Sequence, residues 1–209
     1  MRTTEEYLGN LIKLPFPWLE EVAREADARG IPALGKVCGY FLWQAVRLTA
    51  GRRALELGSG IGYSAVWIAA GLQEGAEILL TDYAEENLKL AEQFVRRARP
   101  DLRVTTHAGE AMELLRQQEP NSLDVLFVDI QKERYPEVLT LARTRLRPGG
   151  LLAADNWLWG RRILDPANRE PSTEGIREFN AQLLRDNGFV SFFLPLRDGL
   201  VLAFRREQP

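Results

Sequence analysis

The spacing of apolar residues divides the chain into an N-terminal helical part and a longer part in which strands and helices alternate. Between Trp18 and Ala26 the apolar positions are 18, 19, 22, 23 and 26, which form one face of a helix. Gly30-Ile31-Pro32 ends this helix, and a second one is predicted over residues 37–48. We therefore expect N-terminal helices within residues 1–50 and an alternating core over residues 51–209.

Short apolar runs within the core predict five strands, at residues 54–57, 78–81, 103–106, 125–128 and 151–154. Amphipathic stretches separate them and predict helices near residues 63–72, 84–98, 110–118 and 134–146. Because parallel strands need a crossover connection, this alternation is typical of a parallel sheet with helices on both faces.

The last forty residues predict one more helix and a hairpin. Ser172-Thr173 can cap a helix that Asn187-Gly188 ends, and the apolar runs 190–194 and 200–204 flank Arg197-Asp198-Gly199. The expected fold is α/β: a doubly wound, Rossmann-like sheet that is mostly parallel and ends in an antiparallel hairpin. No repeat or long linker divides the chain, so we expect residues 1–209 to form a single domain, with ligands at the carboxyl ends of the strands.

Composition narrows the location and the metal chemistry. The 209 residues carry a net charge of −2, and 27% are charged. No segment approaches the ~20 apolar residues of a membrane span, so we expect a cytoplasmic protein with no membrane partner. Cys38 is the single cysteine and His107 the single histidine, which excludes an internal disulfide and zinc sites of the cysteine or paired-histidine type. A metal ion would therefore be held largely by oxygen atoms.

A glycine-rich loop follows the first predicted strand, where it would open a helix. It reads G-S-G-I-G from Gly58 to Gly62, so its spacing differs from the dinucleotide fingerprint, whose third glycine would fall at Tyr63. Glu56, just before the loop, would repel a phosphate but could hold the ammonium group of an amino acid. These features favour S-adenosylmethionine over a dinucleotide. The alternative is a strand-to-helix turn that binds no ligand.

Two more segments complete an expected adenosyl site. Asp82 ends the second strand, about where a carboxylate suits a ribose diol, although it could instead cap the following helix. After the third strand, the run His107 to Ala111 offers a turn and a carboxylate where an adenine would lie.

Oxygen-bearing side chains follow the fourth and fifth strands. Asp129 ends one strand, and Asp155 and Asn156 end the other, so all three should converge on one rim of the sheet. Two carboxylates and an amide form a ligand set for a hard cation, and Mg²⁺ is the expected occupant.

At this point the chain resembles the cation-dependent class I O-methyltransferases, typified by catechol and caffeoyl-coenzyme A O-methyltransferases. The resemblance covers nearly all of residues 35–205. It is carried by E-L-G-S-G-x-G-Y-S (56–64), Thr81-Asp82, Gly109-Glu110-Ala111, F-x-D-x-x-K-x-x-Y (127–135), R-P-G-G (147–150), D-N-W-L-W-G (155–160), I-R-E-F-N (176–180) and L-P-L-R-D-G-L (194–200).

The resemblance implies a role for each residue that matches the motifs. S-adenosylmethionine would contact Glu56, Gly58, Ser64, Asp82, Ala111 and Asp129; Asp129, Asp155 and Asn156 would bind Mg²⁺ or another divalent cation such as Mn²⁺; and Lys132 would be the general base. Lysine can give up its proton beside a dication, whereas arginine cannot, and Lys132 stands in a chain whose other cations are mostly arginines. Relatives are commonly dimers, which implies a homodimer with the Trp18 helix as an interface.

Some residues depart from the family pattern. The segment from Leu34 to Cys38 replaces a common Thr/Ser-Asp segment above the pocket, Ile130-Gln131 replaces a small-acidic pair, and Glu110 replaces Asp. Cys38 itself is expected to be a buried apolar residue. Trp157 and Trp159 could stack on a planar acceptor or cover a core edge.

We interpret the chain as an S-adenosylmethionine- and Mg²⁺-dependent O-methyltransferase that acts on a small aromatic, catechol-like hydroxyl. A transfer RNA hydroxyuridine acceptor is an alternative, although a net charge of −2 is not typical of nucleic-acid binders. Two other classes remain as alternatives: a nucleotide-binding dehydrogenase and a non-catalytic module that binds an adenosyl ligand.

Overall fold

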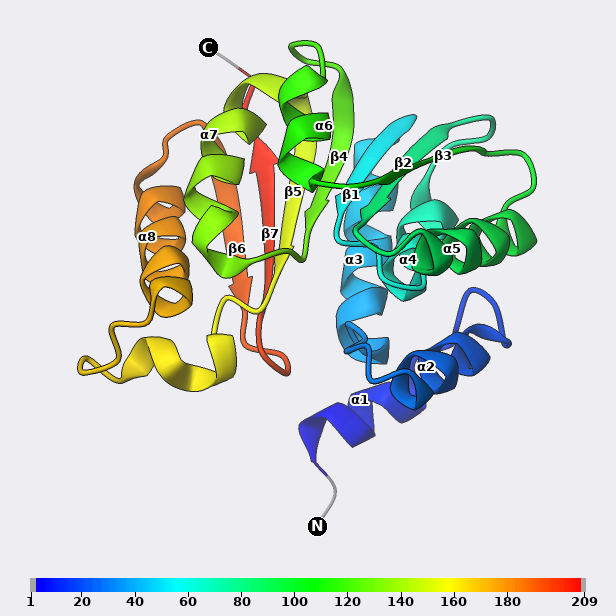
Figure 1. Ribbon diagram of the computed structural model, residues 1–209, viewed down its shortest axis with the longest axis horizontal. Helices are drawn as coiled ribbons and strands as arrows, with labels where there is room; N and C mark the ends of the chain where they lie inside the picture. Colours follow the sequence, from blue (N-terminus) through cyan, green and yellow to red (C-terminus); the bar gives the residue numbers. More distant parts are fainter. Residues whose placement is uncertain (1–2, 208–209) are drawn as a thin grey trace.

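Seven strands form one mixed sheet, flanked by helices on both faces, in the computed structural model, which describes residues 3–207 (Figure 1). The strand order is β3-β2-β1-β4-β5-β7-β6. The strands are β1 (Arg53–Leu57), β2 (Glu77–Asp82), β3 (Arg103–Ala108), β4 (Leu123–Val128), β5 (Leu146–Asp155), β6 (Phe189–Leu194) and β7 (Leu200–Arg205). The helices are α1 (Thr4–Leu11), α2 (Leu19–Ala28), α3 (Lys36–Thr49), α4 (Tyr63–Gly71), α5 (Glu85–Ala98), α6 (Ala111–Gln117), α7 (Tyr135–Arg145) and α8 (Pro171–Arg185), with short 3-10 helices η1 (Lys132–Arg134) and η2 (Trp159–Leu164).

The strand pairing confirms the expected fold class. β1 to β5 pair in parallel, while β7 pairs antiparallel with both β5 and β6. The strand order reverses at β1, because β2 and β3 lie on one side of β1 and β4 lies on the other. Such a switch point leaves a crevice at the carboxyl ends of β1 and β4, where ligands bind in open sheets of this kind.

Alternating side chains of the strands divide the core into two layers. On one face, residues such as Ala54, Ile78 and Phe127 pack against α2 to α5. On the other face, the neighbouring residues Leu55, Leu79 and Leu126 pack against α6, α7 and α8. Side chains of a strand point alternately to opposite faces, so the continuous apolar runs of β1, β2 and β4 are what a sheet buried on both faces requires.

Three local expectations are corrected by the structure. Residues before Trp18 include a helix that apolar spacing did not predict, α1, whose first turn is capped by reciprocal hydrogen bonds between Thr3 and Glu6. Ser172 does not cap α8, because that helix begins at Pro171 and the Ser172 hydroxyl accepts from the Trp159 indole instead. β5 begins at Leu146, five residues earlier than expected, because R-P-G-G is part of the strand.

The helices within residues 3–207 include none that is both long and apolar enough to cross a bilayer.

Candidate functional site

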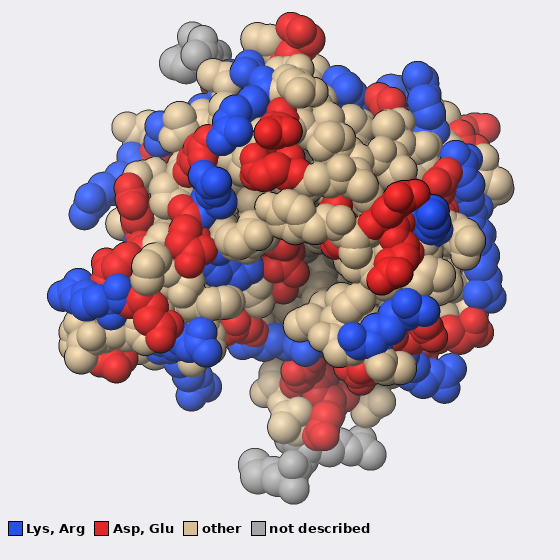
Figure 2. Space-filling model, viewed as in Figure 1, with Lys and Arg blue, Asp and Glu red and all other residues tan. Residues whose placement is uncertain are grey.

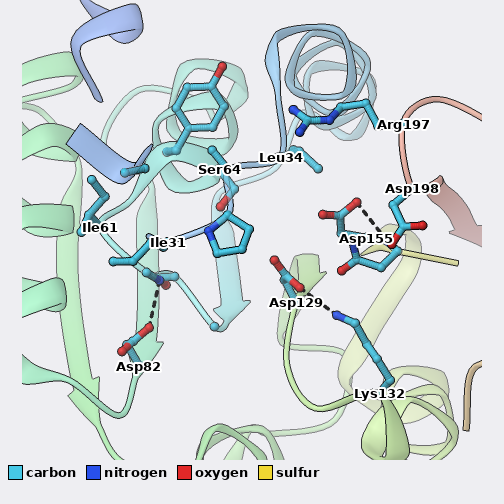
Figure 3. Close-up of a pocket in the computed structure, with 18 of the residues that line it drawn as sticks. Ile31, Leu34, Ile61, Ser64, Asp82, Asp129, Lys132, Asp155, Arg197 and Asp198 are labelled. Atoms are coloured by element: carbon cyan, nitrogen blue, oxygen red, sulfur yellow. Dashed lines mark hydrogen bonds and ion pairs between the residues drawn. The ribbon is translucent and has the colours of Figure 1, made fainter. Parts of the chain in front are cut away.

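A cavity of about 600 Å³ lies at the carboxyl ends of β1, β4 and β5 (Figure 3). The glycine loop forms one wall, the ends of β4 and β5 form another, and the segment before α3 forms the roof. Of the residues predicted for the site, the cavity is lined by Gly58, Ser64, Asp82, Asp129, Lys132, Asp155 and Asn156. The structure therefore brings together most of the side chains that the sequence singled out.

Two predicted residues lie beside the cavity instead of on its wall. Ala111 begins α6 and lines an adjoining cavity of about 190 Å³, which shares Gly58, Asp82 and Asp129 with the larger one. Glu56 is fully buried within β1, next to Ser59 and Ser64, which do face the larger cavity.

The glycine loop is held close to the neighbouring strands. Gly58 has a φ of 82°, and a Cβ there would overlap the backbone carbonyl of Asp129, so only glycine fits between β1 and the end of β4. The loop is tied to β2, because the Ser59 amide donates to the Thr81 carbonyl at 2.7 Å and the Gly60 amide donates to Asp82 at 3.0 Å. Hydrogen bonds to β2 therefore fix the conformation of the loop.

The carboxyl group of Glu56 is buried, and neither of its oxygens has a hydrogen-bond partner. Burial raises its pKa from 4.5 to about 7, and the Ser64 and Ser59 hydroxyls nearby offset only part of that rise. A buried carboxylate without a partner lowers the stability of the fold, and a cationic ligand in the cavity would supply the missing hydrogen-bond donors. The residue thus fits the ammonium group of an amino-acid moiety.

Asp82 is placed both to organise the loop and to face the cavity. One oxygen accepts from the Gly60 amide, and the other accepts from the Ala84 amide at 2.8 Å and from the Asn87 side chain at 3.2 Å. Asp82 does not cap α5, the alternative considered from sequence, because the N-cap residue of that helix is Ala84 and no side chain accepts from its first turn. The carboxylate also lines both cavities, so a ligand hydroxyl can reach it.

The oxygen rim gathers at the ends of β4 and β5. Burial, and next the charge of Asp129, raise the pKa of Asp155 to about 7. Asn156 follows with a φ of 64°, a left-handed conformation that a short amide side chain tolerates. No group of three or more His, Cys, Asp or Glu side chains within residues 3–207 is arranged to hold a metal ion. Two repelling carboxylates and one amide nevertheless fit Mg²⁺, which is usually held by one or two carboxylates and keeps several waters.

Lys132 reaches the same rim from η1. Its side chain is almost fully buried, and its amine donates to Asp129 at 2.8 Å and to the Tyr135 hydroxyl at 3.0 Å. Tyr135 is buried too, and its hydroxyl lies 3.0 Å from the Asp155 carbonyl. Tyr135 belongs to the F-x-D-x-x-K-x-x-Y motif, where its spacing of three residues from Lys132 is the signal for this contact.

The two tryptophans that follow β5 have different surroundings. Trp157 donates to the Leu194 carbonyl at 3.0 Å and packs edge-on against Phe193, so it covers the hairpin. Trp159 lines the cavity, and the Lys132 amine lies 5.5 Å from its ring centroid. Only Trp159 is therefore placed to contact an acceptor.

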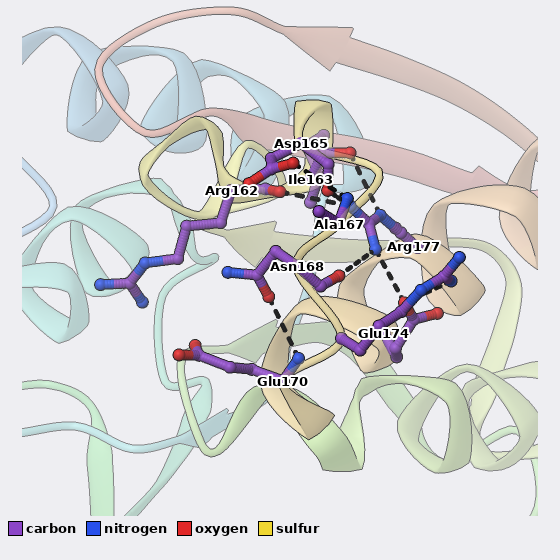
Figure 4. Close-up of polar contacts among 9 residues, drawn as sticks. Arg162, Ile163, Asp165, Ala167, Asn168, Glu170, Glu174 and Arg177 are labelled. Atoms are coloured by element: carbon purple, nitrogen blue, oxygen red, sulfur yellow. Dashed lines mark hydrogen bonds and ion pairs between the residues drawn. The ribbon is translucent and has the colours of Figure 1, made fainter.

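Arg177 of α8 fixes the loop that carries Trp159 (Figure 4). Its guanidinium donates to the carbonyls of Ile163 and Asn168, at 3.1 Å and 2.7 Å, and to those of Arg162 and Asp165. One side chain thus satisfies four backbone acceptors between residues 162 and 168. This role of Arg177 was not predicted, because nothing in the spacing of Arg177 shows which carbonyls it meets.

The roof of the cavity comes from residues that sequence analysis left open. Leu34 lines the cavity, whereas Cys38 is buried, as expected, and burial raises the pKa of its thiol to about 12. Arg197 and Asp198, from the turn between β6 and β7, also line the cavity. They lay within a recognised motif, but only the sheet order shows that this turn meets the ends of β4 and β5.

Known proteins are similar to this chain in sequence and in fold. A model of the O-methyltransferase family matches residues 19–206. The catechol O-methyltransferase of Niastella koreensis is 28% identical over 211 residues, which cover 96% of each chain. Catechol O-methyltransferase domain-containing protein 1 of Mus musculus is 33% identical over 76% of this chain and 62% of its own.

A solved structure supports the same assignment. The O-methyltransferase from Bacillus cereus, crystallised in complex with SAH, is 25% identical to this chain and superposes on it with a TM-score of 0.82. The match covers 97% of this chain and 96% of the Bacillus cereus chain. The chain therefore belongs to the O-methyltransferase family and is an S-adenosylmethionine-dependent O-methyltransferase.

Proposed function

We propose that this enzyme transfers the methyl group of S-adenosylmethionine to one hydroxyl of a catechol-like acceptor in a Mg²⁺-dependent reaction. The observation that carries the proposal is the meeting of Asp129, Lys132 and Asp155 in one cavity with the glycine loop. A module that only bound an adenosyl ligand would not require a buried lysine beside two carboxylates. The names of the relatives point to the same acceptor class.

Different side chains would bind different parts of S-adenosylmethionine. Glu56 accepts from the ammonium group of the methionine moiety, while Asp82 accepts from the ribose hydroxyls. Gly58 allows close approach of the backbone, Ser64 lines the wall nearby, and Ala111 faces the adjoining cavity that suits an adenine. The carboxylates of Glu56 and Asp82 would repel a phosphate, so they favour a ligand that offers hydrogen-bond donors there.

Asp129, Asp155 and Asn156 are the residues that would hold Mg²⁺. When bound, the cation would lower the pKa of a coordinated acceptor hydroxyl and orient it. These three side chains would supply three oxygen ligands, fewer than the six that Mg²⁺ takes, which would leave positions for donors from the acceptor. A vicinal diol provides two adjacent oxygens and is therefore the acceptor geometry that we propose.

Lys132 is the proposed general base. Its amine takes the proton of the acceptor hydroxyl, and the resulting oxyanion attacks the methyl carbon as the bond from that carbon to sulfur breaks. The products are a methyl ether and S-adenosylhomocysteine. Asp129 and Tyr135 hold the amine at the rim, so that the proton has a short path, and Trp159 offers a flat surface for the acceptor ring.

A nucleic-acid acceptor has less support. Lys and Arg side chains alternate with Asp and Glu over the face shown in Figure 2, with acidic side chains beside the hollow near its centre. A phosphate backbone is bound by a continuous basic surface, which this face does not present.

The proposed homodimer rests on family resemblance. In the Trp18 helix, which is the expected interface, the Trp18 ring stacks with Phe16 and with Phe94 and lies under the Arg97 guanidinium, so this ring already packs within the chain. Light scattering on the purified protein tests the stoichiometry.

An acceptor screen tests the proposed function. Labelled S-adenosylmethionine is supplied with catechol, a caffeoyl ester, a monophenol and undermodified transfer RNA. We expect label in catechol and in the ester, and none in the monophenol, which lacks the second hydroxyl. Label in transfer RNA alone would refute the small-molecule proposal.

A further inference from the structure

The charges around the cavity are unevenly distributed. Four aspartates line it, Asp82, Asp129, Asp155 and Asp198, against two cations, Lys132 and Arg197. The Lys132 amine is held by Asp129. Arg197 approaches from the turn between β6 and β7, across the cavity from Lys132, with Asp155 between them in the view of Figure 3.

Arg197 is weakly partnered within residues 3–207. The acid within 4 Å of its guanidinium is Glu5 of α1, at 3.7 Å from Nε, and both side chains are partly exposed. A guanidinium carries five N–H donors in a planar fork, and a single loose ion pair leaves most of them available. The proposed reaction has no use for this cation.

The roof of the cavity is shaped to admit this side chain. Gly35 has a φ of 82°, and a Cβ at Gly35 would overlap the Nη1 and Cδ atoms of Arg197. The guanidinium therefore rests against a glycine backbone in the segment that departs from the family pattern. A larger residue at position 35 would require the Arg197 side chain to move from this position.

We propose that Arg197 determines acceptor specificity by binding a carboxylate on the far side of the acceptor ring from the reacting hydroxyl. This inference rests on the proposed function. A planar guanidinium matches a carboxylate with two parallel hydrogen bonds. The cavity of about 600 Å³ would hold the methionine and ribose parts of the cosubstrate together with the acceptor, which favours a single ring with a short acidic side chain over a bulky nucleotide.

Three acceptors that differ in charge test this proposal: 3,4-dihydroxybenzoate is anionic, catechol is neutral and dopamine is cationic. For the wild type we expect kcat/KM to be highest for the anion and lowest for the cation. In Arg197→Gln, the ratio of kcat/KM for 3,4-dihydroxybenzoate to that for catechol should fall at least about tenfold, mostly through KM. Glu5→Gln, which removes the competing carboxylate, should raise that ratio.

The control is Arg96→Gln, because Arg96 lies on α5 in a pair with Glu92 and does not line the cavity. A ratio in Arg197→Gln that stays within twofold of wild type would overturn the role of Arg197. Calorimetry of 3,4-dihydroxybenzoate binding to the protein loaded with S-adenosylhomocysteine and Mg²⁺ gives a readout that does not depend on turnover. Methylation of catechol without any preference for the anion would refute this inference alone, whereas no methylation and no binding of any diol would refute the proposed function as well.

Discussion

Glu56→Gln should stabilise the ligand-free enzyme while weakening its hold on the cofactor. The wild-type side chain is fully buried and makes no hydrogen bond, and burial raises its pKa from 4.5 to about 7. Above pH 7 the folded protein must carry this buried charge, whereas the unfolded chain carries it in water. The difference in pKa corresponds to a cost of about 3 kcal/mol to the free energy of unfolding.

The sign of the pH dependence follows from the raised pKa. The stability associated with a neutral Glu56 is fully present below pH 4.5 and is lost as the pH rises to about 7. Glutamine is neutral throughout, so the stability advantage of the variant should grow by about 2 kcal/mol between pH 5.5 and pH 8.

Urea unfolding of the ligand-free proteins at pH 5.5 and pH 8 measures this difference directly. Glu86→Gln is the matched control, because Glu86 is exposed on α5. Adding S-adenosylhomocysteine should raise the melting temperature of the wild type more than that of Glu56→Gln. If the advantage of the variant were the same at both pH values, the buried-charge argument would be wrong.

Three further perturbations separate base, metal and loop. Lys132→Arg keeps a positive charge but removes a usable base, so kcat should fall by roughly 10²–10⁴ while calorimetry shows nearly unchanged cofactor affinity; near-normal rates would mean that Lys132 is not the base. Because the pKa of Asp155 is raised to about 7, protons should compete with the cation for this carboxylate. The Mn²⁺ affinity measured by calorimetry should therefore fall up to about tenfold per pH unit below about pH 7. An affinity that does not change with pH would mean that Asp155 is not a metal ligand. Arg177→Ala leaves backbone carbonyls of residues 162–168 without their donor, so hydrogen exchange of this loop should quicken and unfolding free energy fall by about 2–3 kcal/mol; unchanged exchange would mean that the loop holds its shape without Arg177.

The sequence predicted the parallel core because β1, β2 and β4 are buried on both faces and amphipathic helices separate the strands. That pattern is local, and the order of Gly58, Asp82, Asp129 and Asp155 along it sufficed to place them on one rim. α1 was missed because none of its residues is buried, so it has no apolar periodicity for the core to impose. Its signal was instead the pair of capping residues Thr3 and Glu6.

The parts of the site that sequence reasoning missed depend on contacts between distant segments. Arg197 faces the cavity only because β7 inserts between β5 and β6 in the sheet. Arg177 reaches four carbonyls only because α8 packs beside η2. Trp157 and Trp159 have different surroundings because the backbone is left-handed at Trp159, with a φ of 48°. The sequence does not show this difference, because the two side chains are identical and lie two residues apart.

The most direct test of the central claim is the rate of methyl transfer from labelled S-adenosylmethionine to catechol, measured first in excess EDTA and then after Mg²⁺ is restored. Asp129 and Asp155 face each other across a rim whose lysine contacts one of them, an arrangement that we propose serves a cation and a base together. The account predicts no transfer above background in EDTA and full recovery with Mg²⁺. Undiminished transfer to catechol in EDTA would contradict it.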